Sequence, residues 1–253
     1  MKISVITAVY NAEKTIADTI NSVIAGGHDN IEHIIIDGGS TDGTLELIKS
    51  LEHDKLKWIS EKDSGIYDAM NKGIRLATGD YISTLNADDY YVDSIIGEVV
   101  KILEGYPETE IFHGDICYLK GNGSFIFPSH MKDAVKGTLR KCVHHPSSFV
   151  SRNVYDRLGM YDTSYRVSAD SDFFCRCRTN DVKFKYVSKV ITEMRYGGES
   201  ATNWKVLQKE RYSIFKKYDA PLYDLIYYRV FNMGKAQLLS RVKRMLMKTG
   251  LIK

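Results

Sequence analysis

The sequence predicts an α/β fold built on a mainly parallel sheet with flanking helices. Strand-like and helix-like patterns alternate over the first ~100 residues, as a parallel open sheet requires. The apolar runs at 3–9 and 34–36 are continuous, which is typical of strands buried on both faces. Polar side chains follow the strands at the edge where open α/β sheets bind ligands. The alternation therefore also predicts a binding site.

The predicted elements follow one another in order along the first half of the chain. Strands are expected at 3–9, 34–36, 56–60 and 81–85. Apolar residues recur at helical spacing at 16–24, 45–51 and 66–76, and an amphipathic helix at 94–103 completes this half. Asn11 is a candidate N-cap of the first of these helices.

The second half is less regular. "LKGNGSF" predicts a hairpin turn between two strands, and "SADSDFFCRCR" predicts the start of a helix with Ser168 as its candidate cap. The segment 183–194 is rich in strand formers, and the pattern from 203 onward is helical. We therefore expect a main domain over 1–202, with halves at 1–105 and 106–202, and a helical extension over 203–253.

Composition and charge exclude several classes of protein. The net charge of +3 in 253 residues is too small to indicate a nucleic-acid partner. The four cysteines have no CxxC spacing, so buried thiols in a reducing compartment are expected. The apolar run at 3–9 is too short for a signal peptide, and no run approaches the ~20 residues of a membrane-spanning helix. We expect a cytoplasmic protein that is at most peripheral to a membrane.

The positive charge is concentrated in the C-terminal tail. No acidic residue follows Asp224. The basic residues beyond it are Arg229, Lys235, Arg241, Lys243, Arg244, Lys248 and Lys253. The tail is either an ordinary helix packed on the body with a basic outer face or a peripheral anchor on anionic lipid of the inner membrane, at up to ~1 kcal/mol per basic residue.

Two adjacent carboxylates, Asp88 and Asp89 in "LNADDYY", stand where the strand at 81–85 ends. A solvated loop or a helix N-terminus would explain them without any ligand. Beside the other polar strand ends, a hard divalent cation explains them better. Mg²⁺ takes one or two protein carboxylates and fills its shell with water and phosphate oxygens, and Mn²⁺ suits the same ligands. The pair therefore predicts Mn²⁺ or Mg²⁺ bound together with a diphosphate.

Several other polar segments bear on the candidate site or on the class of protein. In "SADSDFFCR", Asp170 and Asp172 are either site residues or helix-terminal acids balanced by the arginines that follow. His145 in "HHPSS" suggests contact with substrate or phosphate, because no further histidine has metal-ligand spacing. In "GIYDAMNKGI", Asp68 and Asn71 lie off the apolar stripe of a helix. The turn "DGGSTDGT" is neither a dinucleotide fingerprint nor a Walker loop, which disfavours a dehydrogenase.

An ordered series of segments runs from residue 3 to about residue 200. They are "SVITAVYNAEKTIADTINSV", "NIEHIIIDGGSTDGT", "SEKDSGIYDAMNKGIRLATGDYISTLNADD", "HHPSSFVSR" and "SADSDFFCR". Together they resemble the inverting family-2 glycosyltransferases of the GT-A fold, most closely the bacterial branch that builds polysaccharides such as O-antigen and colanic acid on lipid carriers. The resemblance implies a Rossmann-like nucleotide-sugar-binding half over 1–105 and an acceptor-binding half over 106–202.

The resemblance implies a role for each matching residue. The family's general base corresponds to Asp170, and its ligand for Mn²⁺ or Mg²⁺ corresponds to Asp89. His145 and Asp172 fall on the acceptor side. The residues expected to bind the nucleotide-sugar are Thr7, Tyr10, Asn11, Asp37, Asp63, Asp68, Asn71, Asn86 and Asp88. Within that set, Asp37 would contact the base and Asp88 the ribose or sugar.

The expected function is transfer of a hexose or N-acetylhexosamine, with inversion, from a nucleotide-diphospho-sugar to a hydroxyl group. A UDP-sugar is the expected donor, and a glycan or lipid-diphosphate-linked saccharide is the expected acceptor. Asn86 replaces the family's leading acid, and Ala169 replaces an acid that often precedes the base. These departures leave open a non-catalytic relative that binds a nucleotide-sugar or glycan. A nucleotidyltransferase is disfavoured because "TAVYNAEKT" is not a glycine-rich basic phosphate loop.

Overall fold

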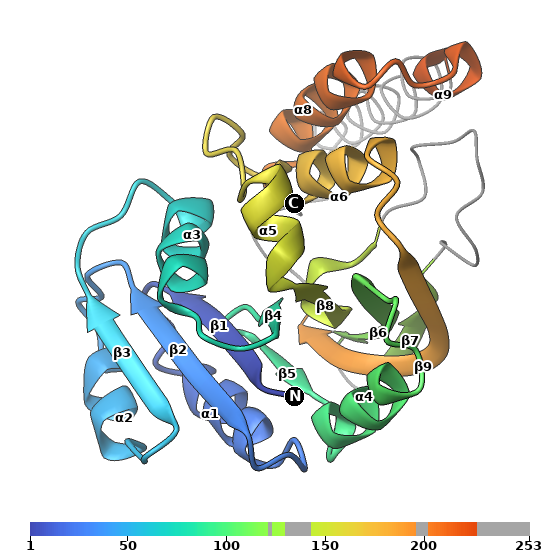
Figure 1. Cartoon of the computed structure of the whole chain (residues 1–253). Coiled ribbons are helices and arrows are strands. Elements are labelled where there is room, and N and C mark those ends of the chain that lie inside the picture. The colour runs from blue at the N-terminus through green and yellow to red at the C-terminus, as the bar shows by residue number, and fades with distance from the viewer. Residues whose placement is uncertain (121–122, 130–142, 196–201, 227–253) are drawn as a thin grey trace, which may run out of the picture.

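The computed structural model describes residues 1–120, 123–129, 143–195 and 202–226 (Figure 1). The strands are β1 (Ile3–Val9), β2 (Ile31–Asp37), β3 (Leu56–Ser60), β4 (Tyr81–Thr84), β5 (Asp89–Tyr91), β6 (Ile111–Lys120), β7 (Gly123–Phe127), β8 (Ser148–Ser151) and β9 (Phe184–Arg195). They form one sheet in the order β3-β2-β1-β4-β8-β6-β9-β5, with β7 paired to β6 outside this path. The predicted α/β architecture is confirmed.

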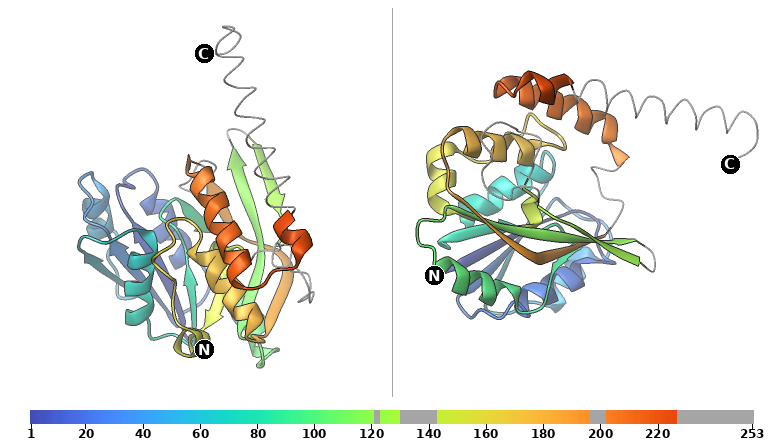
Figure 2. Two further views of the ribbon diagram at one scale, coloured as in Figure 1. Left: turned by 90° about the horizontal axis from the view of Figure 1, so that it is seen from above. Right: turned by 90° about the vertical axis from the view of Figure 1, so that its right-hand side faces the viewer.

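The helices cover both faces of the sheet (Figure 2). On one face lie α3 (Ile66–Leu76), α5 (Arg152–Leu158) and α6 (Ala169–Thr179). On the other face lie α1 (Ile16–Ile24), α2 (Thr44–Ser50) and α4 (Ile95–Glu104). A further helix, α8 (Trp204–Lys217), packs against α6 and leads to the short α9 (Leu222–Ile226). The described part of the chain after residue 202 is therefore helical, as predicted, and α8 lies against the body of the protein.

Strands β1 and β2 form the centre of the first half. Every residue of both strands is buried, which is why their apolar runs are continuous. Ile6 and Ala8 of β1 pack with the core under α3, whereas Val9 packs with the core under α1 and α2. Gly73 allows α3 to approach β1 closely, because a Cβ atom there would lie 2.3 Å from Cγ2 of Ile6. The contact between α3 and β1 therefore requires glycine at this position.

The pairing direction of the strands places the candidate site. β1 is parallel to β2 and β4, and β2 is parallel to β3. Their carboxyl ends therefore meet at one edge of the sheet. Beyond β4 the sheet is mixed, because β8 is antiparallel to β4 and β6, while β9 is parallel to β6 and antiparallel to β5. Strand β5, which begins at Asp89, was not predicted, since its partner β9 is remote in sequence.

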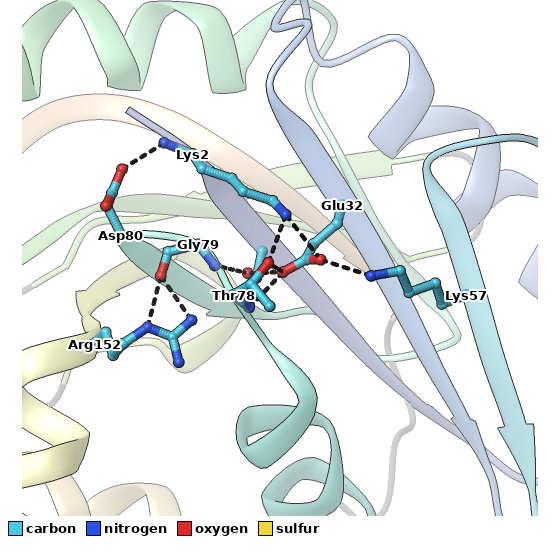
Figure 3. Close-up of polar contacts among 8 residues, drawn as sticks. Lys2, Glu32, Lys57, Thr78, Gly79, Asp80 and Arg152 are labelled. Carbon is cyan, nitrogen blue, oxygen red and sulfur yellow. Dashed lines mark hydrogen bonds and ion pairs between the residues drawn. The ribbon is translucent and has the colours of Figure 1, made fainter.

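Buried Glu32 joins several segments at the amino end of β2 (Figure 3). Its carboxylate accepts hydrogen bonds from Ser4 Oγ at 2.7 Å and from the backbone N–H of Thr78 at 2.6 Å. It also pairs with Lys2 Nζ at 3.1 Å and with Lys57 Nζ at 3.3 Å. Burial raises the pKa of Glu32, but the donors outweigh this effect and lower the pKa to about 2. This network holds the strands together at the end opposite the candidate site.

The sequence predicts buried cysteine thiols and no helix long enough to cross a membrane. Cys117, Cys175 and Cys177 are buried free thiols, as predicted, and Cys142 lies outside the described residues. Among the described residues, no helix has the length and apolar character needed to cross a membrane. The basic residues from Arg229 onward lie outside the described part of the chain. Contact between the tail and a membrane therefore stays a prediction.

Candidate active site

The acidic pair lies where the short loop after β4 enters β5, and this loop is closed by hydrogen bonds. Asn86 Nδ2 donates to Asp89 Oδ2 at 2.9 Å, and the N–H of Asp89 donates to the carbonyl oxygen of Asn86 at 3.1 Å. Arg195, at the end of β9, donates from Nη1 to the carbonyl oxygen of Asp88 at 2.8 Å. Arg195 also forms an ion pair with Asp18 of α1 at 2.5 Å. The loop is therefore held in place by α1 and β9.

The two carboxylates lie in an environment that disfavours their negative charge. Asp89 is 1% exposed. Burial, and then repulsion from Asp88, raise the pKa of Asp89 well above its usual range, and Asn86 and Arg195 offset this only in part. Burial also raises the pKa of Asp88. The surrounding protein therefore supplies too little positive charge for this pair, and a bound cation would compensate for the deficit.

The residues around the pair fit a divalent ion that has few protein ligands. The described residues contain no group of three or more His, Cys, Asp or Glu side chains arranged to hold a metal. Mg²⁺ commonly binds through one or two carboxylates, with water and phosphate oxygens completing its shell. Asp89 and Asp88 would provide these carboxylates, with the nearby amide oxygen of Asn86 as a further oxygen donor. An ion held in this way would depend on a diphosphate for its remaining ligands.

Asp170 lies in the first turn of α6, within reach of two donors. Tyr67 Oη donates to Asp170 Oδ1 at 3.2 Å, and His145 Nδ1 lies 3.5 Å from Asp170 Oδ2. The carboxylate is 18% exposed. Burial raises the pKa of Asp170, but His145 and the positive charge of Arg211 outweigh this effect, so the pKa is lowered overall. Asp170 is therefore ionised at neutral pH and can accept a proton.

His145 connects the two groups of acids. Its Nε2 atom lies 3.4 Å from Asn86 Oδ1, on the opposite side of the ring from Asp170. Asn86 in turn binds Asp89. The side chains of Asp89, Asn86, His145 and Asp170 thus form a continuous series from the β4–β5 loop to the start of α6. The structure therefore brings the predicted metal ligand, the predicted base and the acceptor-side histidine together.

The turn after β2 is built around Asp37. This residue is fully buried, and its carboxylate accepts hydrogen bonds from Gly39 N at 3.0 Å and from Ser60 Oγ at 2.6 Å. Ser40 Oγ donates to Asp37 at 2.5 Å and accepts from the N–H of Asn11 at 2.8 Å. Asp37 therefore orders the strand ends of β2 and β3, and its contact with a nucleotide base stays a prediction.

The residues predicted at the end of the first strand differ in their surroundings. Tyr10 is 63% exposed at the end of β1, whereas Thr7 is fully buried and its Oγ1 lies 2.9 Å from His33 Nε2. Asn11 has a φ of 49° and accepts a hydrogen bond from the N–H of Thr41 at 2.9 Å. It does not cap α1, which begins at Ile16. Sequence alone missed this because the partner of Asn11 lies in the turn after β2.

The residues predicted between β3 and α3 make mainly local contacts. Asp63 Oδ1 accepts from Gly65 N at 2.8 Å, and Asp68 Oδ2 accepts from Ser64 N at 3.1 Å. Both side chains are partly exposed. A Cβ atom at Gly38 would lie 2.6 Å from Asp63 Oδ2, so glycine allows the two turns to meet. The predicted nucleotide contacts of Asp63 and Asp68 stay untested.

Asn71 and Asp172 bind other parts of the protein. Asn71 is buried, and its side-chain amide donates to the carbonyl oxygen of Tyr161 at 2.9 Å and accepts from the Tyr161 N–H at 3.0 Å. Asp172 is fully buried, and its Oδ1 accepts from Lys217 Nζ at 2.8 Å and from Tyr218 Oη at 3.1 Å. Their predicted donor and acceptor contacts stay predictions, and the structure gives each residue a packing role.

A sequence model of the family described as "Glycosyl transferase family 2" matches residues 4–159. The chain belongs to this family. A glycosyltransferase named for PGL/p-HBAD biosynthesis in Mycobacterium bovis (strain BCG / Pasteur 1173P2) is 28% identical over 209 residues, or 79% of each chain. An uncharacterised glycosyltransferase of Mycobacterium tuberculosis (strain CDC 1551 / Oshkosh) is 32% identical over 179 residues, or 69% of this chain and 68% of the relative.

Solved structures confirm the GT-A fold of this family-2 glycosyltransferase. S. aureus TarS 1-349 in complex with UDP-GlcNAc has a TM-score of 0.71 at 19% identity, over 86% of this chain and 65% of TarS 1-349. The mannosyltransferase PcManGT from Pyrobaculum calidifontis, in complex with GDP-Man and Mn²⁺, has a TM-score of 0.68 at 18% identity, over 99% of this chain and 79% of PcManGT. At these identities the likeness supports the fold alone.

Sequence reasoning missed two residues of the candidate site. Tyr67 donates to Asp170, and Arg195 supports the acidic loop. Tyr67 stands in "GIYDAM" beside an apolar stripe, where it is indistinguishable from a core residue. Arg195 ends a strand remote from Asp88 in sequence. Neither position carries a local signal, because both contacts depend on how distant elements pack.

Proposed function

We propose that this family-2 enzyme transfers a sugar, with inversion, from a nucleotide-diphospho-sugar to the hydroxyl of a saccharide acceptor. The observation that carries the proposal is the series of side chains from Asp89 through Asn86 and His145 to Asp170. At one end, burial and mutual repulsion leave the carboxylates of Asp88 and Asp89 short of positive charge, which a cation would supply. At the other end, the lowered pKa keeps Asp170 ionised, so that its carboxylate can accept a proton. Displacement at a sugar carbon needs both functions, one on each side of the bond that breaks.

On the acceptor side, Asp170 takes the proton of the attacking hydroxyl. The hydroxyl oxygen forms a bond to the anomeric carbon, the bond from that carbon to the diphosphate oxygen breaks, and the nucleoside diphosphate leaves with the bonding electrons. General-base assistance of this kind contributes roughly 10²–10⁴ in rate. Tyr67 and His145 keep the carboxylate oriented towards the site through their contacts with its two oxygens.

On the donor side, Asp89 would hold Mn²⁺ or Mg²⁺ together with the diphosphate, and Asp88 would lie against the ribose or sugar. A bound divalent ion neutralises the charge that develops on a departing diphosphate. Asn86 fixes Asp89, and Arg195 fixes the backbone at Asp88, so both carboxylates stay aligned. The ordered turns after β1, β2 and β3 contribute the remaining donor contacts at the same edge of the sheet.

The donor and acceptor are proposed by class. TarS is described with UDP-GlcNAc and PcManGT with GDP-Man, so both UDP- and GDP-sugars are reasonable donors, and UDP-sugars are our first choice. We propose a glycan or lipid-diphosphate-linked saccharide as acceptor, in cell-surface polysaccharide synthesis at the cytoplasmic face of the membrane. The mycobacterial relative named for PGL/p-HBAD biosynthesis supports a role in making a cell-envelope glycoconjugate.

The test is release of nucleoside diphosphate from a panel of UDP- and GDP-sugars, with Mn²⁺, Mg²⁺ or a chelator, and with or without lipid-linked saccharides. We expect release with one donor class, and loss of release with the chelator. Asp170→Asn should lower kcat by roughly 10²–10⁴ while the affinity for the free nucleotide stays the same. Asp89→Asn should weaken nucleotide binding only when the metal is present.

The matched control is Asp54→Asn, which removes an exposed carboxylate before β3, at the opposite end of the sheet. It should leave turnover unchanged. Near-normal turnover of Asp170→Asn would remove Asp170 from the role of base. Nucleotide-sugar binding without release from any donor would instead support a non-catalytic relative.

A further inference from the structure

The start of α6, which carries Asp170, is not held by its own cap residue. Ser168 occupies the N-cap position but makes no side-chain cap hydrogen bond. The hydroxyls of Ser168 and Ser171 are buried without a hydrogen-bond partner among the described residues. A side-chain cap is a common way to satisfy the free backbone N–H groups at a helix start. The local sequence therefore provides no side-chain hydrogen bond that fixes the chain where it enters α6.

Helix α8 supplies that contact through Glu210. Oε1 of Glu210 accepts from the N–H of Arg166 at 2.8 Å, and Oε2 accepts from the N–H of Val167 at 3.1 Å. Each carboxylate oxygen thus binds one of two consecutive backbone groups just before α6. Hydrogen bonds from backbone N–H to an ionised carboxylate are stronger than those between neutral groups. Glu210 therefore fixes the segment that leads into Asp170.

The same helix also holds α6 just after Asp170. Lys217 Nζ and Tyr218 Oη both donate to Asp172, whose side chain has no exposed surface. A buried carboxylate needs such partners, because an unpaired charge in the interior is strongly unfavourable. Asp170 therefore lies between two attachment points to α8, one before it at Val167 and one after it at Asp172.

Apolar side chains also pack between α6 and α8. Ile214 and Phe215 of α8 are fully buried against Cys175 of α6. Arg211, on the same helix, contributes the positive charge that helps keep Asp170 ionised. Helix α8 thus forms hydrogen bonds to the chain before and after Asp170, and the positive charge of Arg211 acts on the Asp170 carboxylate.

We propose that α8 is a positioning element of the active site, in which Glu210 and Lys217 hold the first turn of α6 so that Asp170 points at the acceptor hydroxyl. The inference rests on the proposed role of Asp170 as general base. Neither Glu210 nor Lys217 contacts the reacting atoms in this scheme. The C-terminal extension then contributes to turnover in addition to any contact that its tail makes.

The variants to compare are Glu210→Gln and Lys217→Met, with Lys216→Met as the matched control on an exposed position of the same helix. A displacement of about 1 Å at a reacting group can cost on the order of 10²-fold in rate. We therefore expect kcat to fall by about 10- to 100-fold in the first two variants. The KM for the nucleotide-sugar should stay within about twofold, because the donor residues are untouched.

The readout that excludes a general effect on stability is a double-mutant cycle with Asp170→Asn. If Glu210 acts through Asp170, adding Glu210→Gln to Asp170→Asn should cause no further loss of kcat. The same fold loss in both backgrounds would overturn the inference, as would an unchanged kcat in Glu210→Gln alone. Near-normal turnover of Asp170→Asn would overturn the proposed base itself, so the two failures are distinguishable.

Lys217→Met can prevent folding because it removes the nearer cation from the buried Asp172, leaving Arg176 Nη2 at 3.8 Å and the hydroxyl of Tyr218. The paired variant Asp172→Asn with Lys217→Met removes both charges and avoids this problem. It should fold and show the same selective loss of kcat, whereas Lys217→Arg should retain most of the activity because it preserves the ion pair. Normal kcat in the paired variant would overturn the role of the second attachment point.

Discussion

Glu32→Gln tests whether the network at the amino end of the sheet stabilises the fold through charge. Gln keeps the size of the side chain but removes the negative charge that Lys2 and Lys57 pair with. The pKa of Glu32 falls from its ordinary value of 4.5 to about 2 in the folded protein. At about 1.36 kcal/mol per pKa unit, this fall corresponds to about 3 kcal/mol of stability at neutral pH. We expect the variant to lose about that amount.

The lowered pKa of Glu32 also predicts how its contribution to stability changes with pH. Because the folded-state pKa is lowered, the stabilisation is present above pH 4.5 and is lost as the pH falls towards 2. Linkage gives a loss of about 2 kcal/mol between about pH 7 and about pH 3 in the wild type, and none from this residue in Glu32→Gln.

The assay is urea unfolding of both proteins at several pH values, with the exposed Glu52→Gln as the matched control. The difference in unfolding free energy between wild type and Glu32→Gln should shrink as the pH is lowered. A difference that stays constant with pH would refute the reasoning, because the network would then stabilise the fold by packing alone. The control should follow the wild type throughout.

Two further substitutions test the packing that surrounds the site. Asn71→Ala should lower the free energy of unfolding by about 2–4 kcal/mol, because it leaves the backbone N–H and C=O groups of Tyr161 without their partner. Thermal unfolding measures this loss, and an unchanged Tm would contradict it. Gly73→Ala should lower the free energy of unfolding by about 1–3 kcal/mol, because the added methyl group would clash with Ile6. The control Arg75→Ala, on the exposed side of α3, should change it little. Equal unfolding midpoints for the two variants would rule out the close approach of α3 to β1.

The fold and much of the candidate site could be predicted from local patterns. Continuous apolar runs correctly predicted β1 and β2. The polar residues after the strands indicated a candidate site at the edge where the carboxyl ends of the parallel strands meet. The acidic pair and Asp170 were predicted from segment order and residue type. These features are local, because strand burial and strand ends depend on neighbouring residues in the sequence.

What sequence could not predict are contacts between remote elements. Asn11 was expected to cap α1, but its side chain binds the turn after β2. Asp172 was expected to be either an acceptor-side residue or a helix-terminal acid, and its buried carboxylate accepts a hydrogen bond from Lys217 of α8. In each case a polar residue could be satisfied by several partners, and only the packing of the helices and strands selected one.

The sequence by itself determined the α/β class, the parallel first half and the family of this glycosyltransferase, because hydrophobic periodicity and motif order are properties of the chain alone. Only the tertiary structure decided that His145 and Asn86 join the two groups of acids, that Arg195 supports the acidic loop, and that α8 holds both sides of the first turn of α6. The physical reason is that these side chains meet only after the sheet has formed and its helices have packed.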